Sequence, residues 1–353
     1  MTFVDGVALE IGPGDPRRDL TELIFQTVRA ALDDAGRDID EVDSVVIAAH
    51  DLVDGRSLSS MVTAPAAGAY LKDEIRLGDD GAAAFSLAAA RIEAGEARCS
   101  IVAAWGRASE GDPDSVARAL FDPIVEGAFG LTEVAVAAMR ASQWLGRHGR
   151  AGAAEADRAA AADRRVAHAA ANPWVANGEA ASPAGPPPWP LRPAELPRWA
   201  DVAVAVIVSG RQSPVRVAGI GQASEPYSPG ERDLAAMPGL ALAVGRALPA
   251  GVAVGDVDIA ELDGLTLLDE AIAVEAAGLA APGQGLRALA GDGRINASGG
   301  SAAGYCAPAM GLTRIADAVL RLRDRAGGPG RALATGSSTI AAQTHTAVVL
   351  EAQ

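Results

Sequence analysis

The sequence predicts an α/β protein in which helices cover a parallel or mixed β-sheet. Two short segments, 42–50 (VDSVVIAAH) and 98–106 (RCSIVAAWG), are almost continuously apolar, as is typical of strands buried on both faces. Segments with helical periodicity alternate with them, and this alternation is typical of a sheet covered by helices. The same strand–helix–strand order returns near the C-terminus, which indicates a weak internal repeat.

Two helices are predicted in the N-terminal part. In 19–36, apolar residues recur every three or four positions, Asp19 can cap the start, and Gly36 can end the helix. The segment 81–95 (GAAAFSLAAARIEAG) consists mainly of small residues bracketed by glycines. We therefore expect the second helix to pack deep inside the protein.

The pattern changes between 107 and 200. Two amphipathic helices are predicted at 130–149 and 155–173, followed by the Pro-rich connection 182–197, which cannot form a regular element. This region is interpreted as an insertion that lies over one face of the sheet.

The last part of the chain returns to strands and helices. We expect three regions: an N-terminal half at 1–106, the helical insertion at 107–200 and a C-terminal half at 201–353. The predicted strands of the C-terminal half are 201–209, 215–222, 256–264 and a closing pair within 332–352, and its predicted helices are 238–248 and 267–279.

Composition and charge exclude several classes of function. The 353 residues carry a formal net charge of −15, whereas a nucleic-acid-binding surface needs clustered cations. No apolar run approaches the roughly 20 residues of a membrane span, and the N-terminus does not resemble a signal peptide. The two cysteines, Cys99 and Cys306, and the four histidines show no metal-ligand spacing. We expect a cytoplasmic protein with no metal site and no nucleic-acid partner.

The segment 295–314 (INASGGSAAGYCAPAMGLTR) combines a glycine-rich loop with a helix start, and it resembles a motif of the thiolase superfamily, in its sterol-carrier-protein-type branch. Segments 78–110, 119–124 and 257–279 are similar to other parts of this branch. The residues of the first motif that are in register are Asn296, Gly299, Gly300, Gly304 and Gly311.

This resemblance implies a five-layer αβαβα fold built from two related halves, and a homodimer. It also implies a site for an acyl-CoA thioester, bound as substrate rather than as a cofactor, where the N-termini of two central helices meet. Unpaired N–H groups at helix N-termini suit a thioester oxygen or an oxyanion. On this basis the residues expected to bind the CoA thioester are Gly81, Asn296, Gly299, Gly300 and Gly304.

The residues of ordinary thiolase chemistry are replaced in this chain. Gly78 stands where the family has its cysteine nucleophile, and Leu262 and Tyr305 stand where it has two histidines. Ser337 and Ser338 occupy the region of the family's second cysteine. Ordinary thiolase activity is therefore not expected.

Two functions are compatible with these replacements. The chain resembles thiolase-like aldolases that lack the nucleophile and carry Gly-Tyr at this point, which implies retro-aldol cleavage of a β-hydroxyacyl-CoA. Tyr305 would be the acid/base, with its pKa lowered, and N–H groups near Gly81 and Gly300 would hold the enolate. Those aldolases also have a tyrosine at the position of Leu262, which this chain lacks.

The alternative is a non-catalytic scaffold, or an acyl-CoA-binding subunit, of a larger complex. Members of this branch often work with a small partner that combines a zinc ribbon and an OB-fold, and the substrate could be carried by CoA or by an acyl-carrier protein. This chain contains no such partner domain and would need one in trans.

Three further residues have open roles. Asp79, like its neighbour Asp80, is either a catalytic carboxylate or a helix N-cap. Cys306 is either a displaced nucleophile or a small packing residue. Lys72, the one lysine among thirty basic residues, offers the sole lysine for a Schiff base, but its surroundings predict an exposed position.

Overall fold

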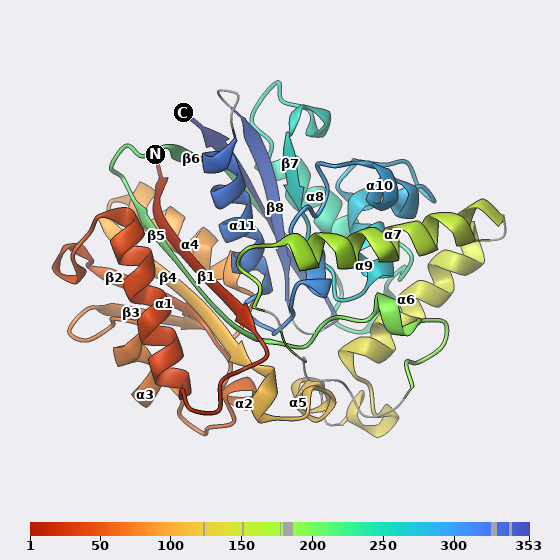
Figure 1. Ribbon diagram of the computed structural model, residues 1–353, viewed down its shortest axis with the longest axis horizontal. Coiled ribbons are helices and arrows are strands. Elements are labelled where there is room, and N and C mark those ends of the chain that lie inside the picture. Colours follow the sequence, from red (N-terminus) through yellow and green to blue (C-terminus); the bar gives the residue numbers. More distant parts are fainter. Residues whose placement is uncertain (123, 150–151, 177, 179–185, 326–329, 339–340) are drawn as a thin grey trace.

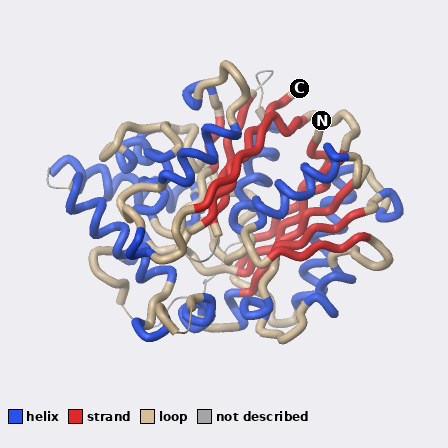
Figure 2. Tube along the Cα trace, turned by 180° about the vertical axis from the view of Figure 1, so that it is seen from behind, coloured by secondary structure: helices blue, strands red, loops and turns tan. Residues whose placement is uncertain are grey.

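The computed structural model describes residues 1–353 except 123, 150–151, 177, 179–185, 326–329 and 339–340. Nine strands in the described residues form one mixed sheet (Figures 1 and 2). The strands are β1 (Phe3–Gly12), β2 (Ser44–Ala48), β3 (Asp73–Leu77), β4 (Cys99–Arg107), β5 (Asp201–Ser209), β6 (Val215–Ser224), β7 (Ile259–Glu261), β8 (Arg331–Ser337) and β9 (Thr344–Ala352).

Eleven α-helices are present among the described residues. They are α1 (Leu20–Ala35), α2 (Asp51–Asp54), α3 (Ser60–Ala66), α4 (Gly81–Ala94), α5 (Pro113–Leu120), α6 (Glu133–His148), α7 (Gly152–Ala171), α8 (Pro238–Ala247), α9 (Leu267–Ala276), α10 (Gly285–Gly291) and α11 (Met310–Asp324). No helix in the described part of the chain is long and apolar enough to cross a membrane.

The sheet consists of two halves with the same pairing pattern. Its order is β3-β2-β4-β5-β1-β6-β9-β8-β7. In the first half β2 runs parallel to β4, and β5 pairs antiparallel with both β4 and β1. In the second half β7 runs parallel to β8, and β9 pairs antiparallel with both β8 and β6. The internal repeat suggested by the sequence is thus present in the strand pairing.

The helices form three layers around the two half-sheets. Helix α1 packs on β1 and β5 at one outer face, and α8 packs on β6 and β9 at the other. Helices α4 and α11 contact each other and strands of both halves, so they form the central layer (Figure 1). The first three turns of α4 are mostly buried between the half-sheets, and its many small residues allow this close packing, as its sequence predicts.

A buried carboxylate joins the starts of the two central helices. Asp80 caps α4 by accepting a hydrogen bond from the Ala82 N–H at 2.8 Å, and its other oxygen accepts one from the Gly311 N–H of α11, also at 2.8 Å. Gly311 must be a glycine because a Cβ there would collide with the Asp80 carboxylate. Gly81 is needed for the same close approach, since its Cβ would lie 2.6 Å from the Leu312 Cβ.

Most predicted elements are confirmed, with small changes of length. Helix α1 has Asp19 as its N-cap and Gly36 in the left-handed conformation at its end, with φ of 59°. Strand β1 was missed, because Asp5, Gly6 and Glu10 interrupt its apolar pattern. Gly6 is required there, since a Cβ would collide with the Ala31 carbonyl of α1.

Strand β5 lies in the N-terminal half-sheet, although the boundary expected at residue 201 assigns it to the C-terminal half. Its whole length pairs with β4 and with β1. The strand pairing favours a division of the halves after β5.

The segment between β4 and β5 covers the other half of the molecule. Helix α6 packs against α9, and α7 packs against α10 and the short turn Gly300–Ala302 (Figure 1). Part of the Pro-rich connection, 182–185, lies outside the described residues.

We expect Asp80→Ala to lower the free energy of unfolding by about 3 kcal/mol, because two buried N–H groups lose their acceptor. Asp19→Ala removes an exposed cap that accepts from Glu22 N at 2.8 Å, and should cost only about 1 kcal/mol. Urea denaturation of both variants measures the difference. Equal losses would show that Asp80 does no more than cap one helix.

Candidate functional site

Tyr305 is held in place by the chain segment that precedes β5. Its N–H donates to the Arg198 carbonyl at 2.8 Å, and its carbonyl accepts from the Ala200 N–H at 3.2 Å. Its ring packs edge to face on Trp199, with ring centroids 5.3 Å apart and planes at 87°. Both the backbone and the ring of Tyr305 are therefore fixed.

Two neighbouring cavities meet at Tyr305. The large cavity, of about 420 Å³, lies between α2, α5 and the Tyr305–Ala307 segment. The small cavity, of about 30 Å³, lies between α6, the loop after β7 and the end of β8. Tyr305 and Glu133 line both cavities. A volume of this size in the large cavity is typical of small-molecule sites.

The expected lowering of the Tyr305 pKa is wrong. The residue is 8% exposed, and burial together with the charges of Asp263, Glu133 and Asp80 raises the pKa of its phenol well above the usual value. At neutral pH Tyr305 is therefore a neutral hydroxyl, which suits it to donate a hydrogen bond or a proton but not to act as a base.

Glu133 is the carboxylate that the sequence reasoning missed. It occupies the first turn of α6, directly after the N-cap Thr132, where an acidic residue ordinarily serves the helix dipole. Its oxygens accept from the Ala341 N–H at 2.9 and 3.2 Å. Burial raises the pKa of Glu133 to about 8, although the Ala341 N–H and Arg140 oppose this. A base with such a pKa is half ionised slightly above neutral pH.

Cys306 and Asp79 lie in different surroundings. Cys306 lines the large cavity, but burial raises the pKa of its thiol, so the thiolate expected of a displaced nucleophile is disfavoured. The Asp79 carboxylate accepts from Asp80 N at 2.7 Å and from the Thr344 hydroxyl at 3.2 Å. Asp79 is not part of the lining of either cavity, so the structure does not bring it to Tyr305.

Asn296 fixes the end of β7. Its side-chain oxygen accepts from the Leu262 N–H at 2.7 Å, and its side-chain nitrogen donates to the Leu262 carbonyl at 3.1 Å. The amide therefore has partners on both sides within the protein. It is not among the residues that line the two cavities.

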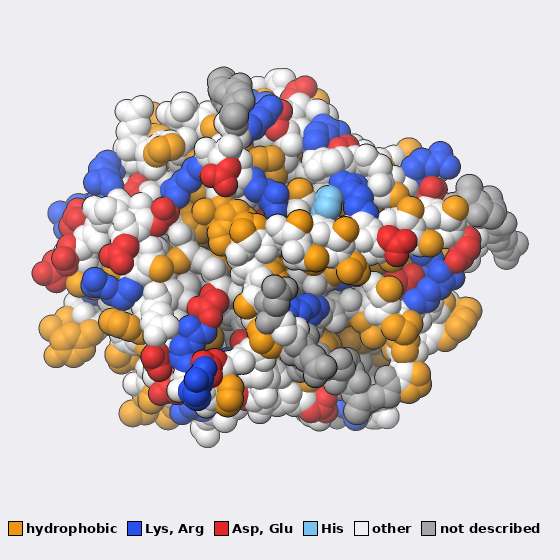
Figure 3. Space-filling view, in the orientation of Figure 1, with side chains coloured by type: hydrophobic (Ala, Val, Ile, Leu, Met, Phe, Trp, Pro, Cys, Tyr) orange, Lys and Arg blue, Asp and Glu red, His pale blue; other side chains and the backbone are white. Residues whose placement is uncertain are grey.

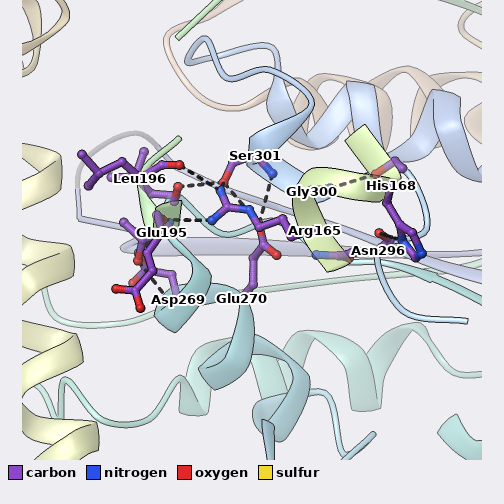
Figure 4. A network of polar contacts seen from close by, with 12 residues as sticks. Arg165, His168, Glu195, Leu196, Asp269, Glu270, Asn296, Gly300 and Ser301 are labelled. Atoms are coloured by element: carbon purple, nitrogen blue, oxygen red, sulfur yellow. Dashed lines mark hydrogen bonds and ion pairs between the residues drawn. The ribbon is translucent and has the colours of Figure 1, made fainter. Parts of the chain in front are cut away.

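The turn after Asn296 is held by a buried charged network (Figure 4). The Glu270 carboxylate accepts from the Ser301 N–H at 3.0 Å and lies 3.4 Å from the Arg165 guanidinium. A Cβ at Gly300 would collide with Glu270, and one at Gly299 would lie 2.6 Å from the Ala169 Cα. These two glycines are thus needed for close packing inside the protein.

Gly81 and Gly304 are also tightly packed. The Gly81 N–H donates to the Pro308 carbonyl at 2.9 Å, and the Gly300 N–H donates to the Ser298 hydroxyl at 3.3 Å. A Cβ at Gly304 would collide with the Ile11 side chain. The N–H groups of Gly81 and Gly300 themselves already have acceptors within the protein.

Lys72, the candidate for a Schiff base, lies away from both cavities. The Lys72 ammonium donates to the Val42 carbonyl at 2.7 Å, outside the lining of both cavities. Within the described residues, no group of three or more His, Cys, Asp or Glu is arranged to hold a metal ion. On the face in Figure 3, basic and acidic side chains are interspersed.

No family model and no curated protein matches the chain. Solved structures match it over nearly its whole length. An "Ltp2-ChsH2(DUF35) aldolase" matches with a TM-score of 0.78 at 20% identity, covering 99% of this chain and 97% of that chain. Human mitochondrial 3-ketoacyl-CoA thiolase in complex with CoA matches with a TM-score of 0.73 at 19% identity, covering 100% and 98%.

A third match is a monomeric SCP2-thiolase-like protein type 1 from Mycobacterium smegmatis, with a TM-score of 0.72 at 18% identity, covering 99% of this chain and 77% of that chain. The chain has the thiolase fold. The five-layer architecture expected from the motifs is confirmed. At these identities the likeness establishes the fold alone, and the chemistry depends on the residues that line the two cavities.

We expect the stability difference between the native chain and Glu133→Gln to depend on pH. Because folding raises the Glu133 pKa from its ordinary value to about 8, its contribution is fully present below about pH 4.5 and is lost as pH rises towards 8. The native chain should lose about 1.4 kcal/mol per pH unit relative to the variant across this window. Urea denaturation at several pH values measures it, and a constant difference would show that the Glu133 pKa is not raised.

Proposed function

We propose that the protein cleaves a carbon–carbon bond in a β-hydroxyacyl-CoA by a retro-aldol reaction. The observation that carries this proposal is that Tyr305 and Glu133 line the same two cavities. The thiolase fold supports a CoA thioester as the substrate class, since the human thiolase of this fold is described in complex with CoA. The fold match to an aldolase supports the type of reaction.

Glu133 carries both proton transfers, and Tyr305 stabilises the enolate between them. Ionised Glu133 takes the proton of the β-hydroxyl group, the bond between the α- and β-carbons breaks, and a ketone or aldehyde leaves. The electron pair stays on the thioester enolate, whose oxygen accepts a hydrogen bond from the Tyr305 hydroxyl. Protonated Glu133 then returns its proton to the α-carbon, which yields the shorter acyl-CoA and restores the carboxylate.

A second candidate is a non-catalytic acyl-CoA-binding or scaffold subunit. It is favoured by Leu262, which is fully buried at the position where the resembling aldolases carry a second tyrosine. In that case the large cavity would bind an acyl group without transforming it.

Mass spectrometry of CoA thioesters tests the two candidates. We expect the native chain to split a panel of β-hydroxyacyl-CoA esters into a carbonyl product and a shorter acyl-CoA, and Tyr305→Phe to lower kcat at least about 100-fold. β-Ketoacyl-CoA esters and acyl-carrier-protein thioesters serve as comparison substrates. Binding without turnover, with and without a co-purified partner, would favour the binding subunit.

Glu133→Gln is the matched variant for the base, because the amide keeps an acceptor for the Ala341 N–H. In the native chain kcat/KM should rise about tenfold per pH unit below pH 8 and level off above it. The variant should lose both the rate and this slope.

We propose that the edge of the N-terminal half-sheet binds a second copy of the chain. Strand β3 pairs with β2 on one side and forms the end of the sheet. Beside it, Met61 and Leu71 are 74% and 88% exposed, and exposed apolar side chains next to an open strand edge favour association. A partner protein is the other candidate, since the aldolase match is named as an Ltp2–ChsH2 assembly.

Analytical ultracentrifugation measures this association. We expect a dimer that Met61→Asp together with Leu71→Asp weakens at least about tenfold, because two charges would be buried in the contact. Arg98→Asp at an exposed ion pair with Asp43 is the control. A monomer at all concentrations would refute the second copy, as would a dimer insensitive to the double variant.

A further inference from the structure

The end of β8 places a serine opposite a histidine at the small cavity. Ser337 lines this cavity and pairs in register with His345 of β9. The Ser337 Oγ lies 3.2 Å from the His345 Nδ1. The Ser337 backbone is fixed, since its N–H donates to the Asp263 carboxylate at 3.1 Å.

A carboxylate stands on the other side of the imidazole. The His345 Nε2 lies 3.3 Å from the Glu225 Oε1, and this oxygen also accepts from the Gly239 N–H at 2.9 Å. Although burial alone would raise the pKa of Glu225, its contacts with His345 and Gly239 lower it. The contact is electrostatic, since Nε2 makes no hydrogen bond within the described residues. The facing carboxylate favours a proton on Nε2, which leaves the Nδ1 lone pair facing Ser337.

The three residues are arranged from the cavity inward. Ser337 is partly exposed to the cavity, whereas His345 is 1% exposed and Glu225 9%. Burial lowers the pKa of His345, so the imidazole is neutral and free to accept a proton at neutral pH. A hydroxyl, a neutral imidazole and a carboxylate in this order form the arrangement that activates a serine nucleophile.

The small cavity also holds a donor for an oxyanion. Arg140 is 4% exposed and lines this cavity, and one of its guanidinium nitrogens donates to the Ala341 carbonyl. Its other terminal nitrogen, Nη1, has no hydrogen-bond acceptor among the described residues. A buried guanidinium N–H without an acceptor stabilises negative charge strongly.

We propose that Ser337, His345 and Glu225 form an acylation site, at which Ser337 attacks esters and thioesters of small acyl groups. The Ser337 Oγ bonds to the carbonyl carbon while its proton passes to the His345 Nδ1, and Arg140 holds the oxyanion. The bond to the leaving thiolate or alkoxide then breaks, and this group takes the proton from His345. Water attacks the acyl-serine by the same route and releases a carboxylic acid. Glu225 is a positioning residue.

The size of the cavity limits the acyl group. About 30 Å³ is close to the volume that one water molecule occupies in the liquid, so the cavity excludes all but the smallest acyl groups, and acetyl esters are the probes to use. This activity is separate from the retro-aldol reaction, because its nucleophile and base are different residues.

The experiment incubates the full chain with p-nitrophenyl acetate, or with acetyl-CoA, and follows the intact mass. We expect one acetyl group per chain, located on Ser337 by peptide mass spectrometry. Ser337→Ala should abolish the adduct. Ser338→Ala is the matched control, since the Ser338 Oγ accepts from Gln343 N and Thr344 N at 3.1 Å and does not contact His345.

His345→Gln should slow acylation at least about 100-fold. Glu225→Gln should slow it less and lower the pH at which acylation becomes fast, because the carboxylate that raises the His345 pKa is lost. Should His345→Gln fail to fold, the Ser337→Ala and Ser338→Ala pair and the Glu225→Gln pH profile still decide. Ser337→Ala should abolish the adduct and Tyr305→Phe should abolish retro-aldol cleavage, so the loss of one reaction without the other separates the two proposals. No adduct, or an adduct that survives Ser337→Ala, overturns the acylation site.

Discussion

The site of this protein depends on the buried contact between the two central helices. The Asp80 carboxylate accepts N–H groups from the starts of both α4 and α11. Residues 305–309 lead directly into α11. The contact therefore also fixes the position of Tyr305 relative to the N-terminal half-sheet. The small residues at Gly81, Gly311 and Gly336 follow from it, since a Cβ at any of them would collide with the neighbouring helix or with Asp80.

A second constraint comes from the insertion. The buried Arg165 of α7 contacts Glu270 and also donates to the Glu195 carbonyl at 2.9 Å, so it joins α9, the glycine turn and the segment before β5 (Figure 4). That segment continues into the backbone bonds and the Trp199 ring that hold Tyr305. The position of the tyrosine is thus set from two sides, by the central helices and by the inserted helices.

The sequence predicts the fold well because its periodic segments are long and its family motifs are spread over the chain. It predicts the site less well. In the sequence, Glu133 looks like an ordinary acidic residue in the first turn of a helix. Its pKa is raised by burial, although it also contacts the Ala341 N–H, 208 residues away along the chain. The contact between Ser337 and His345 depends on the register of the β8–β9 pair, which residue types alone do not define. The glycines of the 295–314 motif were expected to approach a ligand, whereas their missing side chains make room for Ala169, Glu270 and Ile11.

The order of strands in the sheet has a consequence for folding during synthesis. Strand β5 lies between β4 and β1 in the N-terminal half-sheet, yet it leaves the ribosome almost one hundred residues after β4. Until then β4 and β1 have no shared neighbour, and their apolar edges stay open. Meanwhile α6 and α7 have been made before α9 and α10, the helices of the C-terminal half against which they pack. Neither half can therefore be completed alone, and the chain should gain its stable structure late, as one cooperative unit.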